Sequence, residues 1–298
     1  MRTTKRASPA ANAILSHGVR ITSPDRRPYP QAKVSKRELV AYYENVSAVM
    51  LPHIAGRPLT LIRCPRGVDA PCFVQQHAAP GLPEAIRTVS LTEASGETGA
   101  HLYVDDLAGI LACVQLGALE LHGWGARASA LEEPDRLVFD LDPDPSVPFR
   151  AVVDAALLIR DHLLEDGLTS WPMLSGGKGV HVVVPLTGAT WPAASAWAKR
   201  LAQSLEKQAP DRFTSAMAKA ERAGRIFIDY LRNERGATAV MPYSTRAKAG
   251  ASISMPLSWE ELARAPSAQA YTVHDVLTNG LPQMPGLGIE QRLPTQME

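Results

Sequence analysis

The chain has 298 residues, of which 45% are hydrophobic and 20% are charged, and its formal net charge at pH 7 is +1. This composition is ordinary for a globular protein and suffices for one large domain or two lobes. No run of eighteen apolar residues occurs, and no apolar segment follows the basic N-terminus. These absences exclude a membrane-spanning helix and a signal peptide, so we expect a soluble cytoplasmic protein with no membrane partner.

Positive charge is concentrated near the N-terminus. Residues 1–37 contain nine Lys or Arg residues and a single acid, Asp25. We expect residues 1–22 to form a basic extension, of which residues 1–12 would be a solvated, partly disordered tail. The charges between Arg26 and Arg37 adjoin a predicted helix, where they could contact phosphate groups.

The cysteines show no pairing pattern in the sequence. Cys64, Cys72 and Cys113 are an odd number of cysteines without a C-x-x-C pair. This argues against a disulfide framework and against a structural zinc site built on cysteines. We therefore expect three buried thiols.

The first predicted helix begins with a capping box, Ser35 to Glu38, and is expected to end at Pro52. A strand is expected at Leu59–Arg63. Phe73 follows among polar neighbours. It is either a half-buried packing residue or a surface on which a nucleic-acid base can stack.

A second helix and a short strand come next. Asp105 or Asp106 can cap a helix with an apolar stripe. The strand Ala118–His122 then places Glu120 and His122 on its polar face. His122 is either solvated or part of a site formed with the strand that follows.

Two aspartates share one face of the strand Leu137–Asp142. Because side chains alternate along a strand, its apolar residues face one side, and Asp140 and Asp142 face the other. A rise of about 6–7 Å separates the two aspartates, so their side chains can converge on one hard cation. The alternative is a solvated pair of carboxylates at a strand end.

A glycine-rich segment joins two apolar runs further along. From Ser175 to His181 it reads Ser-Gly-Gly-Lys-Gly-Val-His. Such a turn lets backbone N–H groups approach an anion. The Ser175 hydroxyl, the Lys178 ammonium and the His181 imidazole together suit a triphosphate. The segment is not a P-loop, because the G-x-x-x-x-G-K-[ST] spacing is absent. The other interpretation is a plain hairpin turn.

A third aspartate, Asp229, lies within the apolar strand Gly224–Leu231. A buried carboxylate without a partner is costly, so Asp229 requires a cation. That cation is either a metal ion or a neighbouring arginine. The candidate arginines are Arg225, Arg232 and Arg235.

The other predicted elements frame these motifs. Helices are expected from about Pro148 to Glu165 and from about Thr190 to Pro210. Another capping box runs from Ser258 to Glu261, and from about residue 265 the chain is a Pro-rich, weakly patterned tail.

Three carboxylates, a glycine-rich loop with Lys and His, and basic surfaces together indicate two-metal phosphoryl chemistry. Oxygen ligands favour Mg²⁺ or Mn²⁺ over zinc. A nuclease and a nucleotidyltransferase both use such a site. The triphosphate loop favours nucleotidyl transfer.

A resemblance to a known family rests on three segments: Leu137–Pro143, Ser175–His181 and Arg225–Asn233. They look like the three motifs of the archaeo-eukaryotic primase superfamily. More closely, the chain resembles, from about Ser23 to Glu261, the polymerase domain of the bacterial ligase D proteins of non-homologous end joining. The resemblance implies an α/β (α+β) fold in which an RRM-like antiparallel sheet packs beside an α/β unit, with the active site in the cleft between them.

The resemblance also implies the catalytic roles. Asp140, Asp142 and Asp229 would hold two divalent metal ions, Mn²⁺ or Mg²⁺, and a primer 3′-hydroxyl would attack the α-phosphate of a nucleoside triphosphate. The residues implied for the nucleotide are Ser175, Gly177, Lys178, His181, Arg246 and, beside it, His122.

The resemblance implies DNA contacts as well. Arg26 and Lys36 fall where the family binds the 5′-phosphate of a gapped or broken duplex end. Phe73 falls at a base-stacking position, with Val74 where close relatives often have a second aromatic and Gln76 where Lys is common. Family members often favour ribonucleotides, fill gaps and add untemplated nucleotides. Ku and a DNA ligase would be partners, at the nucleoid.

The expected organisation is an extension, residues 1–22, and a two-lobed catalytic domain, residues 23–298. The chain ends soon after the region of resemblance, so it is either a stand-alone enzyme, which Met1 favours, or a part of a larger protein. Two other functions stay open. They are a replicative or plasmid primase-polymerase and a non-catalytic DNA-end-binding module.

Overall fold

The computed structural model of this protein describes residues 12–93, 96–282 and 290–294. The fold is mixed α/β, with two six-stranded sheets whose strands are mostly antiparallel. The expected α/β (α+β) class is therefore confirmed. None of the helices in the described part combines the length and apolar composition that crossing a bilayer requires.

The helices are α1 (Lys36–Ile54), α2 (Leu107–Gln115), α3 (Phe149–Glu165), α4 (Trp191–Gln208), α5 (Trp259–Arg264) and α6 (Val273–Asn279), with short 3-10 turns η2 (Lys219–Arg222) and η3 (Leu231–Asn233). The strands are β1 (Ala13–Ser16), β2 (Val19–Thr22), β3 (Leu59–Arg63), β4 (Phe73–Gln75), β5 (Arg87–Thr92), β6 (Thr98–Tyr103), β7 (Ala118–Trp124), β8 (Arg136–Pro143), β9 (Trp171–Leu174), β10 (Val180–Pro185), β11 (Phe213–Thr214), β12 (Ile226–Asp229), β13 (Thr238–Val240) and β14 (Met255–Pro256).

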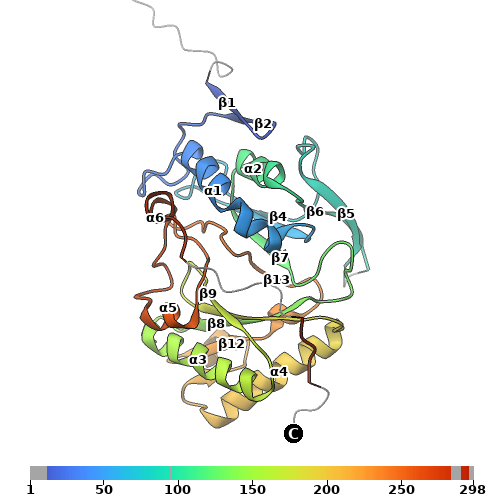
Figure 1. The fold of residues 1–298 in the computed structure, drawn as a ribbon, viewed down its shortest axis with the longest axis vertical. Coiled ribbons are helices and arrows are strands. Elements are labelled where there is room, and N and C mark those ends of the chain that lie inside the picture. Colours follow the sequence, from blue (N-terminus) through green and yellow to red (C-terminus); the bar gives the residue numbers. More distant parts are fainter. Residues whose placement is uncertain (1–11, 94–95, 283–289, 295–298) are drawn as a thin grey trace, which may run out of the picture.

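The two sheets lie one above the other in Figure 1, with helices on their outer sides. In the first sheet the strands follow the order β13-β7-β3-β6-β5, and β4 also pairs with β3. In the second sheet the order is β11-β12-β8-β10-β9-β14. Helices α1 and α2 pack together on the side of the first sheet, and α3 and α4 contact the second (Figure 1).

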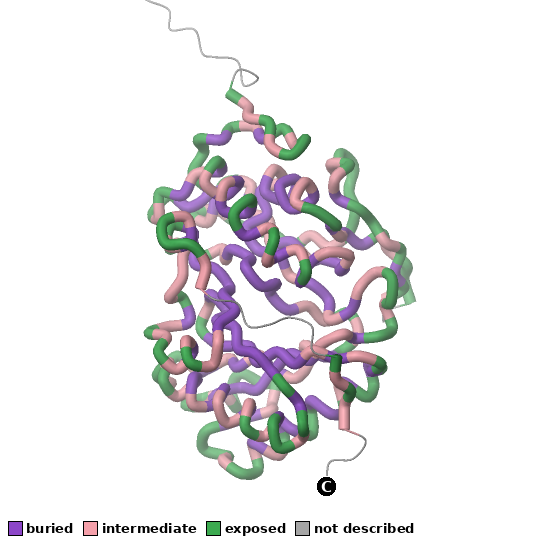
Figure 2. Tube along the Cα trace, viewed as in Figure 1, coloured by how far each residue is buried: buried purple, intermediate pink, exposed green. Residues whose placement is uncertain are grey.

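Strand β8 has the predicted alternation. Leu137, Phe139 and Leu141 are fully buried, and the Phe139 ring meets the edge of Trp197 from α4 with 6.3 Å between ring centroids. These side chains belong to a hydrophobic cluster that also includes α1 and α2. Figure 2 shows buried residues concentrated along the central strands. The apolar face of β8 thus fixes which side the aspartates take.

The capping box of α1 is confirmed, but its predicted end is wrong. The Ser35 hydroxyl accepts the Glu38 N–H, and the Glu38 carboxylate accepts the Ser35 N–H. The helix continues through Pro52 to Ile54. Pro52 removes only its own backbone donor in the last turn, and burial of Ile54 holds that turn in place.

The prediction of three buried thiols is wrong for two cysteines. Cys64 and Cys72 form a disulfide, whereas Cys113 is free and buried. The reason is register: Arg63 of β3 pairs with Phe73 of β4, so the residues just beyond this pair face each other. A spacing rule could not reveal this pairing.

Other helix predictions are confirmed. Asp106 caps α2 by accepting the Gly109 N–H, and α3 and α4 begin after Pro148 and Thr190. The expected tail, however, contains α6, which begins with a capping box at Thr272 and packs against α1. That helix is too short for a recognisable apolar period.

The basic N-terminal region contains a hairpin that the sequence did not predict. Strands β1 and β2 pair with each other, and β2 lies against α2. Of the expected tail, residues 1–11 lie outside the described residues.

Candidate active site

Strand register brings the three aspartates to neighbouring positions. Pairing of β12 with β8 sets Asp229 opposite Asp140 and Phe227 opposite Asp142. On the other side of β8, His181 of β10 is opposite Asp140. Directly paired residues point to the same face of a sheet, so Asp229, Asp140 and His181 form one row across three strands.

Two arginines neutralise these carboxylates in the described chain. Arg232 lies 3.2 Å from Asp140 through Nη2 and 3.2 Å from Asp229 through Nε. Arg222 lies 3.3 Å from Asp142. Asp229 was expected to pair with either a metal ion or an arginine. The structure shows an arginine partner, and of the three candidates this partner is Arg232.

The pKa values of the carboxyl groups differ. Burial would raise the pKa of Asp140, but His181, 3.4 Å away, and Arg232 together lower it below its usual range. Burial and the Asp140 charge raise the pKa of Asp142. Burial also raises the pKa of Asp229, with Arg232 acting in the opposite direction.

Burial is the largest cause of the raised pKa values of Asp142 and Asp229, and the nearby Asp140 charge raises both further. The donor atoms are all carboxylate oxygens, which suit a hard divalent cation such as Mg²⁺ or Mn²⁺. The Asp142 side chain is 48% exposed, so solvent can reach it. The site therefore fits divalent metal binding.

The glycine-rich segment is the turn of the β9–β10 hairpin, as one of the two interpretations stated. The Ser175 hydroxyl accepts the N–H groups of Gly177 and Gly179, each at 3.2 Å. A Cβ at Gly179 would lie 1.8 Å from the Leu141 carbonyl oxygen, so no larger residue fits there. The Lys178 side chain is exposed at the tip.

A buried carboxylate that sequence reasoning left without a role, Glu120, organises the opposite wall. It accepts a hydrogen bond from His122 at 2.8 Å and from the Ala247 N–H at 2.9 Å, and lies 3.0 Å from Arg246 Nε. Burial would raise the pKa of Glu120, but His122 and Arg246 lower it to about 2. In the sequence, the only indication that Glu120 belongs to the site was its position two residues before His122.

Arg246 joins this wall to the glycine-rich turn. Besides approaching Glu120, its guanidinium donates to the Ser175 carbonyl oxygen. Its orientation is thus set by groups from β7 and from the β9–β10 hairpin.

A cleft of about 280 Å³ unites these groups. Its walls come from both sheets, since β7 and β13 line one side and β8 and β10 the other. The predicted residues in the lining are His122, Asp140, Asp142, Ser175, Gly177, Lys178, His181 and Arg246. Asp229, which is 9% exposed, is not in the lining, and Arg232 and Lys248 are additional members.

The residues predicted to contact DNA do not line this cleft. Lys36 is 4% exposed, and its ammonium donates to the carbonyl oxygens of Thr22 and Gln115 and to the Gln115 side chain. Arg26 is exposed and donates to the Pro65 carbonyl oxygen. Phe73 is 47% exposed, as either interpretation of this residue allowed.

Comparison with known proteins identifies relatives. Residues 35–281 match the family model for LigD, primase-polymerase domain. The multifunctional non-homologous end joining protein LigD of Pseudomonas aeruginosa is 34% identical over 309 residues, covering 100% of this chain and 36% of that protein. The multifunctional non-homologous end joining DNA repair protein LigD of Mycobacterium tuberculosis is 35% identical over 269 residues, covering 87% of this chain and 35% of that protein.

A solved structure has a similar fold. The polymerase domain of Mycobacterium tuberculosis ligase D in complex with DNA has a TM-score of 0.80 at 33% identity, covering 88% of this chain and 96% of that one. The chain spans about a third of the length of the LigD proteins it matches, and polymerases of this kind use divalent metal ions. The chain belongs to the LigD primase-polymerase domain family, a family of nucleotidyltransferase-type polymerases.

Proposed function

We propose that this chain transfers nucleotides from nucleoside triphosphates to the 3′-hydroxyl of a DNA primer, filling gaps or extending broken ends during non-homologous end joining. The observation that carries the proposal is the row Asp229, Asp140 and His181, beside a cleft that Lys178 and Arg246 also line. Acidic ligands and basic side chains in one cleft suit a reaction in which a triphosphate meets divalent cations. The end-joining context is supported by the names of the relatives.

The carboxylates would act as the metal ligands. Asp140, Asp142 and Asp229 would hold two Mg²⁺ or Mn²⁺ ions, which stabilise charge on the attacking and leaving oxygens when bound. Arg222 and Arg232 contact the same carboxylates, so these ion pairs and metal ions compete for the same oxygens.

The basic side chains of the cleft would bind the triphosphate. The ammonium of Lys178 is exposed, and Arg246 is held by Glu120 and the Ser175 carbonyl, so its guanidinium loses little freedom when it meets a phosphate. His181 would orient Asp140. His122, fixed by Glu120, would lie beside the nucleotide.

Primer extension tests this function. With a gapped duplex bearing a 5′-phosphate, Mn²⁺ and either ribo- or deoxynucleotides, the labelled primer should lengthen, and the two nucleotide pools give the sugar preference. A primer that shortens would indicate a nuclease. Binding without extension would indicate an end-binding module, and synthesis on a circular single strand without a primer would indicate a primase.

The DNA end would be recognised through its 5′-phosphate by Arg26 and Lys36. No carboxylate of the described residues pairs with Lys36, and burial together with the nearby Arg26 charge lowers the pKa of Lys36 to about 8. To bind the phosphate, the Lys36 ammonium would exchange its hydrogen bonds to Thr22 and Gln115 for the anion, and the bound anion would relieve the repulsion from Arg26.

Replacing Lys36 with methionine should weaken binding to gapped DNA with a 5′-phosphate by about tenfold, because one charged contact is lost. In the unmodified chain, the preference for the 5′-phosphate should fall between pH 7 and pH 9. The reason is that the Lys36 cation is lost as the pH rises through about 8. Affinity for duplexes with and without the phosphate, at both pH values, measures the effect.

The control is Lys199→Met, which removes an exposed lysine from α4. It should leave the phosphate preference unchanged. Equal losses on DNA with and without the phosphate in Lys36→Met would contradict the assignment.

The remaining features of the proposal concern the DNA surface and the partners. Phe73, with the Arg63 guanidinium 5.0 Å from its ring centroid, would stack on a template base. Residues 1–22 would be an extension of the catalytic domain, residues 23–298. Ku and a DNA ligase would act on the same DNA ends at the nucleoid.

A further inference from the structure

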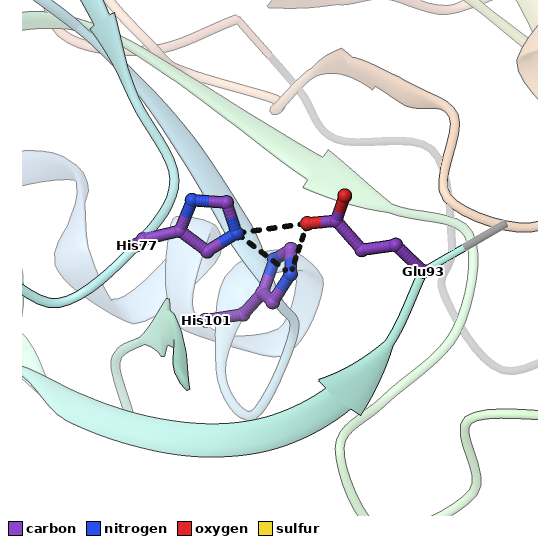
Figure 3. A group of neighbouring side chains, drawn as sticks. All are labelled: His77, Glu93 and His101. Carbon is purple, nitrogen blue, oxygen red and sulfur yellow. Dashed lines mark hydrogen bonds and ion pairs between the residues drawn. The ribbon is translucent and has the colours of Figure 1, made fainter. Parts of the chain in front are cut away.

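A second cluster of metal-ligating side chains lies in the first sheet, outside the cleft. His77 follows β4, Glu93 follows β5, and His101 belongs to β6 (Figure 3). Glu93 Oε1 lies 2.8 Å from His77 Nε2 and 3.1 Å from His101 Nε2, and the two Nε2 atoms are 3.2 Å apart. Three ligand atoms thus converge on one point, and none of the three residues lines the catalytic cleft.

We propose that His77, Glu93 and His101 bind one Zn²⁺ ion, separately from the metal ions of the active site. Two imidazole nitrogens and one carboxylate oxygen form a typical zinc donor set and leave a fourth position for water. Zinc bonds of about 2.0–2.1 Å at tetrahedral angles place donor atoms roughly 3.3 Å apart. The present separations of 2.8, 3.1 and 3.2 Å are shorter by about half an ångström or less, so a small movement would admit the ion.

The backbone around the cluster is already ordered to present these ligands. His77 and His101 form an isolated antiparallel bridge, and the Ala78 N–H donates to the Ala100 carbonyl at 2.8 Å. Glu93 is held at the end of β5 by its N–H, which donates to the Glu97 carbonyl at 2.8 Å. Each ligand therefore extends from hydrogen-bonded backbone.

A glycine makes room for the first histidine. A Cβ at Gly99 would lie 2.9 Å from Cδ2 and 3.0 Å from Nε2 of His77, so a larger residue would displace the ring. The His101 side chain is 5% exposed, and its ring meets the edge of Trp124 with 6.2 Å between centroids. The inner histidine is thus fixed, while Glu93 and His77 keep the site open to solvent.

The same contacts could belong to a hydrogen-bonded triad without an ion. Two imidazole Nε2 atoms 3.2 Å apart avoid repulsion in one of two ways. Either one ring donates its Nε2–H to the other ring, or the rings donate to the Glu93 carboxylate. Zinc would replace those protons, since a metal-ligating histidine binds through a ring nitrogen that carries no proton. Metal content distinguishes these two states.

The bound ion would fasten the β5–β6 hairpin to the segment that follows Phe73. Arg235, which comes after the Asp229 strand, donates to the Thr92 carbonyl at 2.8 Å and lies over the Trp124 ring. The hairpin therefore contacts both the sheet that carries Phe73 and the chain beyond Asp229. A zinc ion bound near the turn of this hairpin would tie these segments together, outside the cleft of the proposed nucleotidyl transfer.

The test measures zinc in untagged protein. The unmodified chain, dialysed against Zn²⁺ in excess Mg²⁺, should retain one Zn²⁺ per chain by mass spectrometry, and titrated Co²⁺ should give the visible absorption of a tetrahedral site. His77→Gln and Glu93→Gln should weaken binding at least about tenfold. Both replaced side chains are partly exposed, which limits the risk of misfolding, and thermal unfolding checks it.

Two controls separate this site from others. His162→Gln alters a histidine that lies 3.4 Å from Glu165 and has no third ligand among the described residues, and it should keep full zinc binding. Asp140→Ala, which disables the proposed catalytic site, should also keep it. The proposal is overturned if the unmodified chain retains no zinc, if His77→Gln binds as tightly as the unmodified chain, or if Asp140→Ala loses the ion.

Discussion

Replacing Asp140 with alanine should reduce primer extension by at least about a thousandfold, because loss of a metal ligand removes several kcal/mol of transition-state stabilisation. Asp140 is the central member of its row, opposite both Asp229 and His181, and it shares Arg232 with Asp229. Binding to gapped DNA should be unchanged or tighter, since the substitution removes a negative charge near a polyanion. Extension rates and DNA affinities of the purified variant measure both effects.

Asp144→Ala is the matched control. This aspartate continues the two-residue spacing beyond β8, but its carboxylate accepts hydrogen bonds from Ser146 and it does not line the cleft. Its removal should change extension by less than about tenfold. An Asp140→Ala variant that still extends primers, or that loses DNA binding in parallel with activity, would refute the assigned role.

Replacing Arg57 with alanine should lower the free energy of unfolding by about 3–5 kcal/mol, because it removes a fully buried side chain together with three hydrogen bonds from a charged donor. The Arg57 side chain is 0% exposed and lies 2.5 Å from Asp135. It also donates to the carbonyl oxygens of His53, at 2.6 Å, and Trp124, at 3.2 Å. One guanidinium therefore joins the end of α1, the end of β7 and the residue before β8. Its removal takes a hydrogen-bond donor from both carbonyl oxygens and leaves Asp135 with only Arg127 and Arg136 as cationic neighbours.

Urea denaturation measures this effect, with Arg127→Ala as the control. Arg127 approaches the same Asp135 carboxylate at 3.6 Å, but its side chain is 39% exposed. Its replacement should lower the free energy of unfolding by about 1 kcal/mol or less. Equal losses in the two variants would show that burial of Arg57 has no special effect.

Periodicity and capping predicted the parts of the chain whose structure is set locally. Alternation placed Asp140 and Asp142 opposite the apolar face of β8, and capping boxes located the starts of α1 and α5. These signals work because a strand or helix exposes its pattern within a few residues. The family resemblance then supplied the fold and the enzyme class, which comparison with relatives confirmed.

Features that depend on pairing between distant strands could not be predicted. Arg232 was one of three candidate partners for Asp229, and only the β12–β8 register brings Asp140 to the same guanidinium. The Cys64–Cys72 bond depends on the β3–β4 register in the same way. Glu120 gave a weak signal because its partner Arg246 is far along the chain.

Strand β8 uses one alternating pattern for two purposes, since its odd-numbered residues pack the core and its even-numbered aspartates face the cleft. Hydrogen-bonded neighbours on both sides, β12 and β10, leave it no free edge along which to slide. A single-residue insertion or deletion within the strand would turn leucine and phenylalanine outward and carboxylates inward. Such an insertion or deletion would abolish folding and catalysis together. The effect of β8 on catalysis is therefore measured with point substitutions, which keep the strand register.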